Sequence, residues 1–445
     1  MSNQNKLSLK EKIAYGSGAF GYSISNTLLL VFFNFYLTDV VGFAPVYATI
    51  IQVLRKAWDA FNDPLIGTLN DRSNGRWGRR KTFIIVGLIP YGLLFALLWQ
   101  VPYFSSSIEN LLWFIFLVFA YDTAMTLVWI PYNAITPELT QDYNERTNLN
   151  GYRQAFSMLA GLVAVASVDI LAGYYSNEKE KFSVLGIIAA IAIVLPFLIV
   201  LWGIKEKPHV VNKQEAQKIA TLFKETFSNK AFVVAVAIFF LSWVSIAIGT
   251  SMVAYFVKYW MHIKPMKILL AIQLSALVSI PFLVKLSEKI GKKQTYIFGI
   301  LFWAVVQICM IFLQPDQETF SIVLAALAGI GVGAAHVIPW AMIPDCIDAG
   351  ELQTGQRREG AYYGVLTFVE KVGSALALGG VGLVLQLCGY VGAAEHQSSL
   401  SIWAIRILMS IGPAIFLLIS IFVAFYYPLS KQKHDEIRKQ LSKAI

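Results

Sequence analysis

The sequence has few charged residues and few cysteines. Only 14% of its 445 residues are Asp, Glu, Lys or Arg, whereas 57% are hydrophobic. A water-soluble globule with this balance would expose large apolar patches. The three cysteines, Cys309, Cys346 and Cys388, are odd in number and widely spaced, so they predict neither a disulfide framework nor a zinc site. The composition predicts an all-α integral membrane protein.

The sequence also lacks the motifs of nucleotide-dependent and hydrolytic enzymes. It has no GxxxxGK[ST] loop to hold phosphates and no nucleophile elbow, and its five histidines are scattered along the chain rather than spaced as metal ligands. We therefore expect no enzymatic activity and no cofactor. Any uphill process would have to draw its energy from an ion gradient.

Apolar runs long enough to cross a membrane recur along the chain. A bilayer core of about 30 Å requires a helix of roughly 20 residues, and by this measure we expect about twelve spans. The predicted spans are 13–37, 45–70, 82–102, 110–136, 151–174, 183–204, 229–258, 266–287, 294–313, 319–343, 361–387 and 401–427. The first run, 13–37, is too long for a secretory signal, so we expect it to remain in the mature chain. The predicted domains are a six-helix bundle over 1–204, a linker over 205–230, a second six-helix bundle over 231–427 and a tail over 428–445.

Topology explains the net charge of +9. Most Lys and Arg residues lie in every second loop, including 71–81, the linker and the tail, whereas the alternate loops hold few. Because cytoplasmic loops carry the excess of positive charge, we predict that both termini and the linker are cytoplasmic. The basic charge therefore reflects topology and predicts no nucleic-acid partner, and the apolar spans predict contact with the lipid bilayer.

The two predicted bundles resemble each other in their cytoplasmic loops. The loop LNDRSNGRWGRRKTF after the second span matches LSEKIGKKQTY after the eighth, and IPYNAITPELTQDYNERTNLNGYR after the fourth matches IPWAMIPDCIDAGELQTGQRREGAYYG after the tenth. Two parallel six-helix repeats are typical of the major facilitator fold, in which the substrate site lies near the membrane midplane. We therefore predict that fold, with twelve transmembrane helices in two six-helix bundles.

Two carboxylates interrupt the second predicted span. A charge in the hydrocarbon region costs about 3 kcal/mol or more, so such residues usually face a partner, a cation or a water-filled cavity. Arg55, Asp59 and Asp63 follow one another at four-residue intervals and project from one helix face. One interpretation is an ion pair between Arg55 and Asp59. The other is a site for a small hard cation such as sodium, or for a proton.

The fourth and eleventh predicted spans carry polar residues that would complement this site. Asp122 and Thr126 lie one turn apart in the fourth span and offer oxygen atoms, although a neighbouring helix could equally satisfy Asp122. In the eleventh span, Thr367 lies one turn before Lys371. We expect Lys371 to neutralise the two carboxylates of the second span while no ion is bound.

A third group of charged residues lies in the cytoplasmic loops. Opposite charges at helix ends could pair between the two halves in the outward-facing state and part in the other state, although surface pairs are individually weak. We interpret these residues as gating residues: Asp71, Arg72, Arg76, Arg79, Glu138, Arg146, Asp345, Arg357 and Glu359.

The motifs together resemble a known family. WDAFNDPLIGTLNDRSNGRWGRRKTF, IPYNAITPELTQDYNERTNLNGYRQAF and PDCIDAGELQTGQRREGAYYGVLTFVEKVGSA are similar to segments of the glycoside, pentoside and hexuronide cation symporters, the melibiose permease group. The similarity covers nearly the whole chain. It implies inward transport of a sugar together with sodium, lithium or a proton, by alternating access.

The resemblance also implies roles for individual residues. The family's cation site falls on Asp59, Asp63 and Thr126, its charge-linking lysine falls on Lys371, and an arginine near the sugar falls on Arg153. Thr367 lies beside that lysine. Two aspartates that bind galactosyl hydroxyls in the melibiose permease are replaced here by Tyr22 or Ser23 and by Trp129, and Asp122 would be a replacement carboxylate.

These observations lead to one expected function and one alternative. We expect a monomeric, sodium-driven sugar symporter of a bacterial inner membrane, with a proton or lithium as other possible coupling ions. The alternative cargo is an amphiphile such as a lysophospholipid, which Trp129 in place of an aspartate favours. A membrane sensor that moves nothing is a third class, and it would show no gradient-dependent flux.

Overall fold

The structure, a computed structural model, has helices and no strand in the residues that it describes. These are residues 7–73, 78–102, 104, 106–139, 143–204, 226–263, 265–355 and 359–444. In this part of the chain, ten helices are long and apolar enough to span a membrane, or eleven if the bent pair Leu9–Val31 and Phe33–Val40 counts as one span. Pro45–Arg72 is 28 residues long but is not among them, because it carries four charged residues before its last turn.

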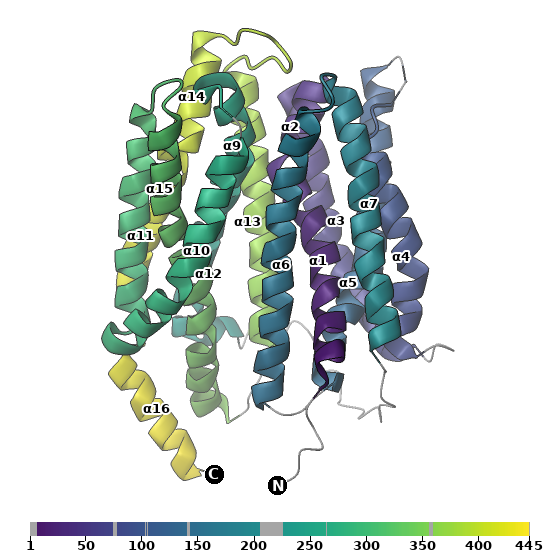
Figure 1. The fold of residues 1–445 in the computed structure, drawn as a ribbon. Helices are drawn as coiled ribbons and strands as arrows, with labels where there is room; N and C mark the ends of the chain where they lie inside the picture. The colour runs from purple at the N-terminus through teal and green to yellow at the C-terminus, as the bar shows by residue number, and fades with distance from the viewer. Residues whose placement is uncertain are drawn as a thin grey trace. The chain divides into compact units, whose positions relative to one another are not determined.

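The chain divides into two compact units, and each is described by itself. The first comprises residues 1–212 and 391–396, and the second comprises 213–390 and 397–445. The first unit contains α1 (Leu9–Val31), α2 (Phe33–Phe35), α3 (Pro45–Arg72), α4 (Arg79–Leu98), α5 (Ser107–Leu139), α6 (Tyr143–Ala172) and α7 (Glu178–Gly203) (Figure 1). The second contains α9 (Lys230–Phe256), α10 (Pro265–Ile290), α11 (Lys292–Cys309), α12 (Glu318–Thr354), α13 (Glu359–Leu387), α14 (Ser399–Met409), α15 (Ile411–Phe425) and α16 (Lys431–Ala444).

The two units repeat the same internal packing. In the first unit α1 packs on α6 and α7, α5 packs on α3 and α4, and α4 packs on α7. In the second unit α9 packs on α13 and α15, α12 packs on α10 and α11, and α11 packs on α15. When α1, α3, α4, α5, α6 and α7 are matched in order with α9, α10, α11, α12, α13 and α15, the five pairings are the same. This agreement is what two sequence repeats in parallel orientation would produce.

The repeat extends to single residues in the loops that the sequence comparison aligned. Gly78 and Gly291 precede α4 and α11 with φ of 106° and 89°. Three residues after Gly78, Lys81 donates a hydrogen bond to the carbonyl of Leu201 at 2.8 Å, and two residues after Gly291, Lys293 donates one to the carbonyl of Phe425 at 2.7 Å. A lysine close to each glycine, although not at the same position, therefore links α4 to the end of α7 and α11 to the end of α15.

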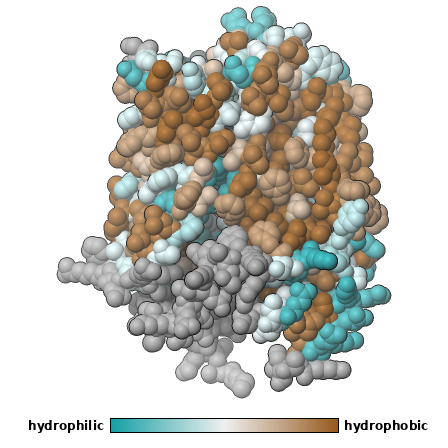
Figure 2. Space-filling model, turned by 180° about the vertical axis from the view of Figure 1, so that it is seen from behind, coloured by the Kyte–Doolittle hydropathy of each residue, from teal (hydrophilic) through white to brown (hydrophobic). Residues whose placement is uncertain are grey.

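The helices present apolar side chains to their surroundings. Figure 2 shows hydrophobic residues over most of the visible face of the helices, with hydrophilic residues gathered at their ends. On α4, for example, Val86, Ile89 and Leu93 are each more than half exposed. Such a surface is stable in lipid and would aggregate in water. The chain is a multi-pass membrane protein.

The polar ends of several helices run further than hydropathy predicts. α12 continues from the predicted end at 343 to Thr354, where Gly355 adopts a left-handed conformation with φ of 69°, and α6 begins at Tyr143 rather than at 151. The tail, predicted only as cytoplasmic, contains α16. Hydropathy detects the part of a helix that lies in lipid, so polar turns beyond the membrane escape it.

We predict that Gly291→Ala lowers the melting temperature of the purified protein. A side chain at φ of 89° costs about 1–3 kcal/mol. Gly380→Ala is the matched control: a Cβ at this exposed position meets no atom within 4 Å, and alanine favours a helix interior by about 0.5–1 kcal/mol. Equal melting temperatures for the two variants would contradict the prediction.

Candidate functional site

α3 places a stripe of charged residues against α5 in the first unit. The side chains of Arg55 and Asp59 are 5% and 6% exposed, and Asn62 is 3% exposed. Charges with so little contact with the surroundings require partners or a bound ion. Because α3 packs on α5, side chains of α5 supply partners for this stripe.

The structure brings Asp63 together with Thr126. The Thr126 hydroxyl donates a hydrogen bond to Asp63 Oδ1 at 3.1 Å, and Thr126 is fully buried. Asp59 lies one turn before Asp63 on the same helix. In the part of the chain that the structure describes, no three or more His, Cys, Asp or Glu side chains gather into a metal-binding group. The candidate cation ligands are therefore two carboxylates and a hydroxyl.

A buried ion pair lies close to these ligands. Arg55 Nη1 is 3.3 Å from Asp122 Oδ1, and Arg55 Nε donates to Gln52 Oε1 at 3.3 Å. Asn62 Nδ2 donates to the main-chain carbonyl of Asp122 at 3.3 Å. Asp122 is 0% exposed. Its Oδ1 is paired with Arg55 of the neighbouring helix, in line with one of the two interpretations of the sequence, whereas its buried Oδ2 has no hydrogen-bond partner among the described residues. Its burial argues against the substrate contact that the other interpretation gives it.

Trp129 lies in an aromatic stack between α1 and α5. Its ring is 3.5 Å from the ring of Tyr22, centroid to centroid, and nearly parallel to it. Tyr132, one turn further along α5, stacks on Trp129 and on Tyr15. Tyr22, one of the two residues that the resemblance offers for the first aspartate of the melibiose permease, thus stacks on Trp129, the residue that it offers for the second.

Arg153 on α6 lies near this stack. Its Nη1 donates to Asn133 Oδ1 at 2.9 Å, and the Asn133 amide donates to the carbonyl of Trp129 at 3.0 Å. One turn after Arg153, Ser157 forms a 2.6 Å hydrogen bond with Ser23 of α1. These contacts gather a guanidinium, an amide and two hydroxyls beside the aromatic stack.

Thr367 and Lys371 lie one turn apart on α13, in the second unit. Thr367 is exposed, and its hydroxyl donates to the carbonyl of Tyr363 at 3.0 Å. Lys371 is half-buried within its unit. The structure thus gives both residues the same helix face that the sequence predicts.

The predicted gating residues are described to different extents. Asp345 accepts a hydrogen bond from Lys292 at 2.6 Å and lies 3.5 Å from His434 of α16, so its described partners belong to its own unit. Arg76 and Arg357 lie outside the described residues. For the remaining members the structure describes the backbone alone: Asp71 and Arg72 in α3, Arg79 in α4, Glu138 in α5, Arg146 in α6 and Glu359 in α13.

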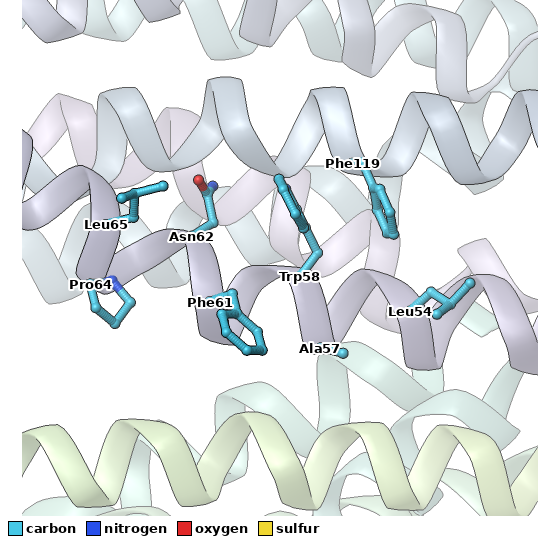
Figure 3. A pocket seen from close by; sticks show the side chains of 8 residues that line it. All are labelled: Leu54, Ala57, Trp58, Phe61, Asn62, Pro64, Leu65 and Phe119. Atoms are coloured by element: carbon cyan, nitrogen blue, oxygen red, sulfur yellow. The ribbon is translucent and has the colours of Figure 1, made fainter. Parts of the chain in front are cut away.

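An apolar pocket of about 720 Å³ lies on the face of α3 next to the charged stripe. Figure 3 shows Trp58 and Asn62 extending toward α5, whereas Phe61 points away from it. The Trp58 ring stacks on Phe119 with a centroid distance of 5.0 Å, and its Nε1 donates to Thr123 Oγ1 at 2.9 Å. The pocket is lined by Leu54, Ala57, Trp58, Phe61, Asn62, Pro64, Leu65 and Phe119.

Sequence reasoning did not assign a role to Gln52, Asn62 or Asn133. Each is an amide three or four residues, about one helical turn, from a residue that it did single out: Arg55, Asp59 and Trp129 respectively. An amide inside a predicted membrane span is a signal of hydrogen bonding across helices, and that signal would have identified these positions.

Comparison with known proteins agrees with this description. A family model for "MFS/sugar transport protein" matches residues 14–431. The chain is 31% identical to the uncharacterized symporter sll1374 of Synechocystis, over 98% of this chain and 97% of that protein. It is 27% identical to the isoprimeverose transporter of Lactiplantibacillus pentosus, over 89% and 84%, and 26% identical to the sodium-dependent lysophosphatidylcholine symporter 1 of Mus musculus, over 98% and 89%.

Solved structures share the fold. The crystal structure of a bacterial homolog to the human lysosomal transporter Spinster, inward-facing and unoccupied, matches with a TM-score of 0.66 and 14% identity, over 94% of this chain and 95% of that one. The nucleoside transporter NupG matches with a TM-score of 0.62 and 16% identity, over 94% and 97%. The predicted fold and the resemblance to the melibiose permease group are confirmed. The chain belongs to the MFS/sugar transport protein family and is a membrane transporter, not an enzyme.

Proposed function

We propose that this transporter couples the entry of sodium to the uptake of a sugar or glycoside by alternating access. The observation that carries the proposal is the contact between Asp63 and Thr126, with Asp59 one turn away, inside a helix pair of a membrane protein. Carboxylates held at this depth without a function would cost free energy for no gain. Sodium-dependent relatives such as the lysophosphatidylcholine symporter support this choice of ion.

The chemistry of these residues suits a small hard cation. Carboxylate and hydroxyl oxygens are its preferred ligands. Because Pro64 lies inside α3 and has no N–H, the main-chain carbonyl oxygen of Ala60, one turn earlier, receives no helical hydrogen bond from it. This carbonyl oxygen is a further candidate ligand. Two like charges one turn apart repel each other. A bound cation offsets this repulsion, and we infer that the loaded site then favours substrate binding and turnover.

We assign the sugar to the aromatic stack and the polar groups beside it. The stack of Tyr22, Trp129 and Tyr132, in which Trp129 is partly exposed, offers apolar ring surface against which the C–H face of a sugar can pack, and the Arg153 guanidinium can donate to ring hydroxyl oxygens. Thr367 and Lys371 of α13 are assigned to the substrate as well. The isoprimeverose transporter among the relatives supports a sugar as the cargo.

The remaining assignments concern location and gating. Because basic residues mark the cytoplasmic loops, we place both termini in the cytoplasm and the protein, as a monomer, in a bacterial inner membrane. The charged residues at the cytoplasmic helix ends, Asp345 among them, are the proposed gating residues. The pair of Asp345 with Lys292 would hold the cytoplasmic ends of α11 and α12 together.

Asp59→Asn and Asp63→Asn are each expected to abolish stabilisation by sodium. The measurement is the melting temperature of the purified protein in sodium chloride against choline chloride, with lithium chloride and a pH series in parallel. Thr126→Val keeps the shape but removes the hydroxyl, and we expect about tenfold weaker sodium affinity, since hydrogen bonds to charged groups contribute about 1.5–3 kcal/mol.

The matched control for the aspartates is Asp316→Asn. This residue is exposed in the second unit, and its φ of 64° suits asparagine. It should respond to sodium as the wild type does. An undiminished sodium response in Asp59→Asn would remove the basis of the cation assignment.

Trp129→Ala and Arg153→Gln are expected to lower the uptake of a labelled sugar at least tenfold, because each removes a contact surface of the substrate. Uptake is measured in proteoliposomes with an inward sodium gradient, using isoprimeverose among a panel of disaccharides. Trp129→Phe should retain most of the activity. Lys179→Gln, which removes one exposed positive charge from the same unit, is the control for net charge.

The pocket on α3 supports one alternative cargo. Its apolar lining and volume of about 720 Å³ would accept the tail of an amphiphile. Ala57→Trp would fill this pocket. If the cargo is lysophosphatidylcholine, this variant should lose its sodium-dependent uptake, whereas uptake of a sugar should continue.

A further inference from the structure

Asp122 is a carboxylate that the proposed sodium and sugar sites do not use. It is completely buried, and its Oδ1 lies 3.3 Å from Arg55 Nη1. It also lies within electrostatic reach of Asp59. A buried carboxylate beside a cation site would normally add to that site or compete with it. Its contacts indicate a different role.

Arg55 has two acidic residues within its reach. On its own helix, Asp59 follows four residues later, which is the spacing at which a guanidinium and a carboxylate meet on a helix surface. On α5, Asp122 faces it across the helix interface. A guanidinium drawn to Asp59 would place a positive charge on the carboxylate that sodium requires.

The hydrogen bonds of Arg55 favour Asp122 over Asp59. Its Nε donates to Gln52 Oε1 at 3.3 Å, and Gln52 belongs to the turn that precedes Arg55. Asp59 belongs to the turn that follows. The contact with Gln52 holds Nε at the turn that precedes Arg55, and the contact with Asp122 holds Nη1 on α5, so both described hydrogen bonds of the guanidinium go to acceptors other than Asp59.

The same strip of α5 serves both the arginine and the cation ligands. Asp122 accepts Arg55, and Thr126, one turn later, donates to Asp63. Asn62 fixes the register between them, because its amide donates to the carbonyl of Asp122 at 3.3 Å. A shift of α5 along α3 would therefore disturb both contacts at once.

We propose that Asp122 is a positioning residue that holds Arg55 away from Asp59 and so preserves the negative charge of the sodium site. The inference rests on the proposed function, because it assumes that Asp59 and Asp63 bind the cation. It assigns to Arg55 and Asp122 a role in cation affinity without contact with the ion. Loss of Asp122 releases Arg55 to Asp59, whereas loss of both residues leaves the two cation ligands as they are.

The test compares Asp122→Asn with the double variant Arg55→Gln/Asp122→Asn. The readout is the sodium concentration that gives half of the maximal thermal stabilisation, measured against choline chloride, with lithium and proton titrations alongside. We expect Asp122→Asn to require at least tenfold more sodium. The double variant should return to within threefold of the wild type, a rescue that a purely structural role would not produce.

The outcomes separate this inference from the proposed function. If Asp59→Asn keeps the full cation response, the proposed cation site fails. If Asp59→Asn loses the response while Asp122→Asn keeps wild-type sodium affinity, the positioning role is overturned. Should Asp122→Asn not fold, the double variant decides: wild-type affinity supports the inference, and affinity weakened tenfold or more overturns it.

Discussion

The cost of burying charge in a membrane helix governs the first unit of this transporter. α3 buries the charges of Arg55 and Asp59 and partly buries that of Asp63, so neighbouring groups must supply partners. Asp122 and Thr126 do so at two successive turns. The α3–α5 interface is therefore specified by polar contacts as much as by packing. The alignment of the two helices and the chemistry of the site are set by the same side chains.

Two side chains of α5 contact charges of opposite sign on α3. Asp122 pairs with a cation that belongs to the protein, whereas Thr126 donates to Asp63, a carboxylate that we propose binds a cation from solution. A buried ion pair stabilises little when compared with apolar packing, but breaking it by removing one partner is costly. The Arg55–Asp122 pair is therefore better understood as a fixed orientation for α3 than as a source of stability.

Sequence patterns predicted the fold because two signals agreed. Apolar runs located the spans, and the aligned loops around Gly78 and Gly291 revealed the repeat that the helix pairings of both units show. The ends of α6 and α12 were misplaced because polar turns outside lipid have no hydropathy signal. At the site, four-residue spacing placed Asp59 and Asp63 on one face of α3, but spacing alone could not choose between Asp59 and Asp122 as the partner of Arg55. That choice depends on the distance between two helices, which no local pattern contains.

The charged stripe of α3 also has a consequence for how the chain enters the bilayer. Among the long helices of the described region, α3 is too polar to partition into lipid as a single segment. Its buried arginine finds its acidic partner 67 residues later in the chain. The polar face of α3 therefore stays uncovered until α5 packs against it, so the two helices are stabilised in the hydrocarbon as a pair rather than one by one.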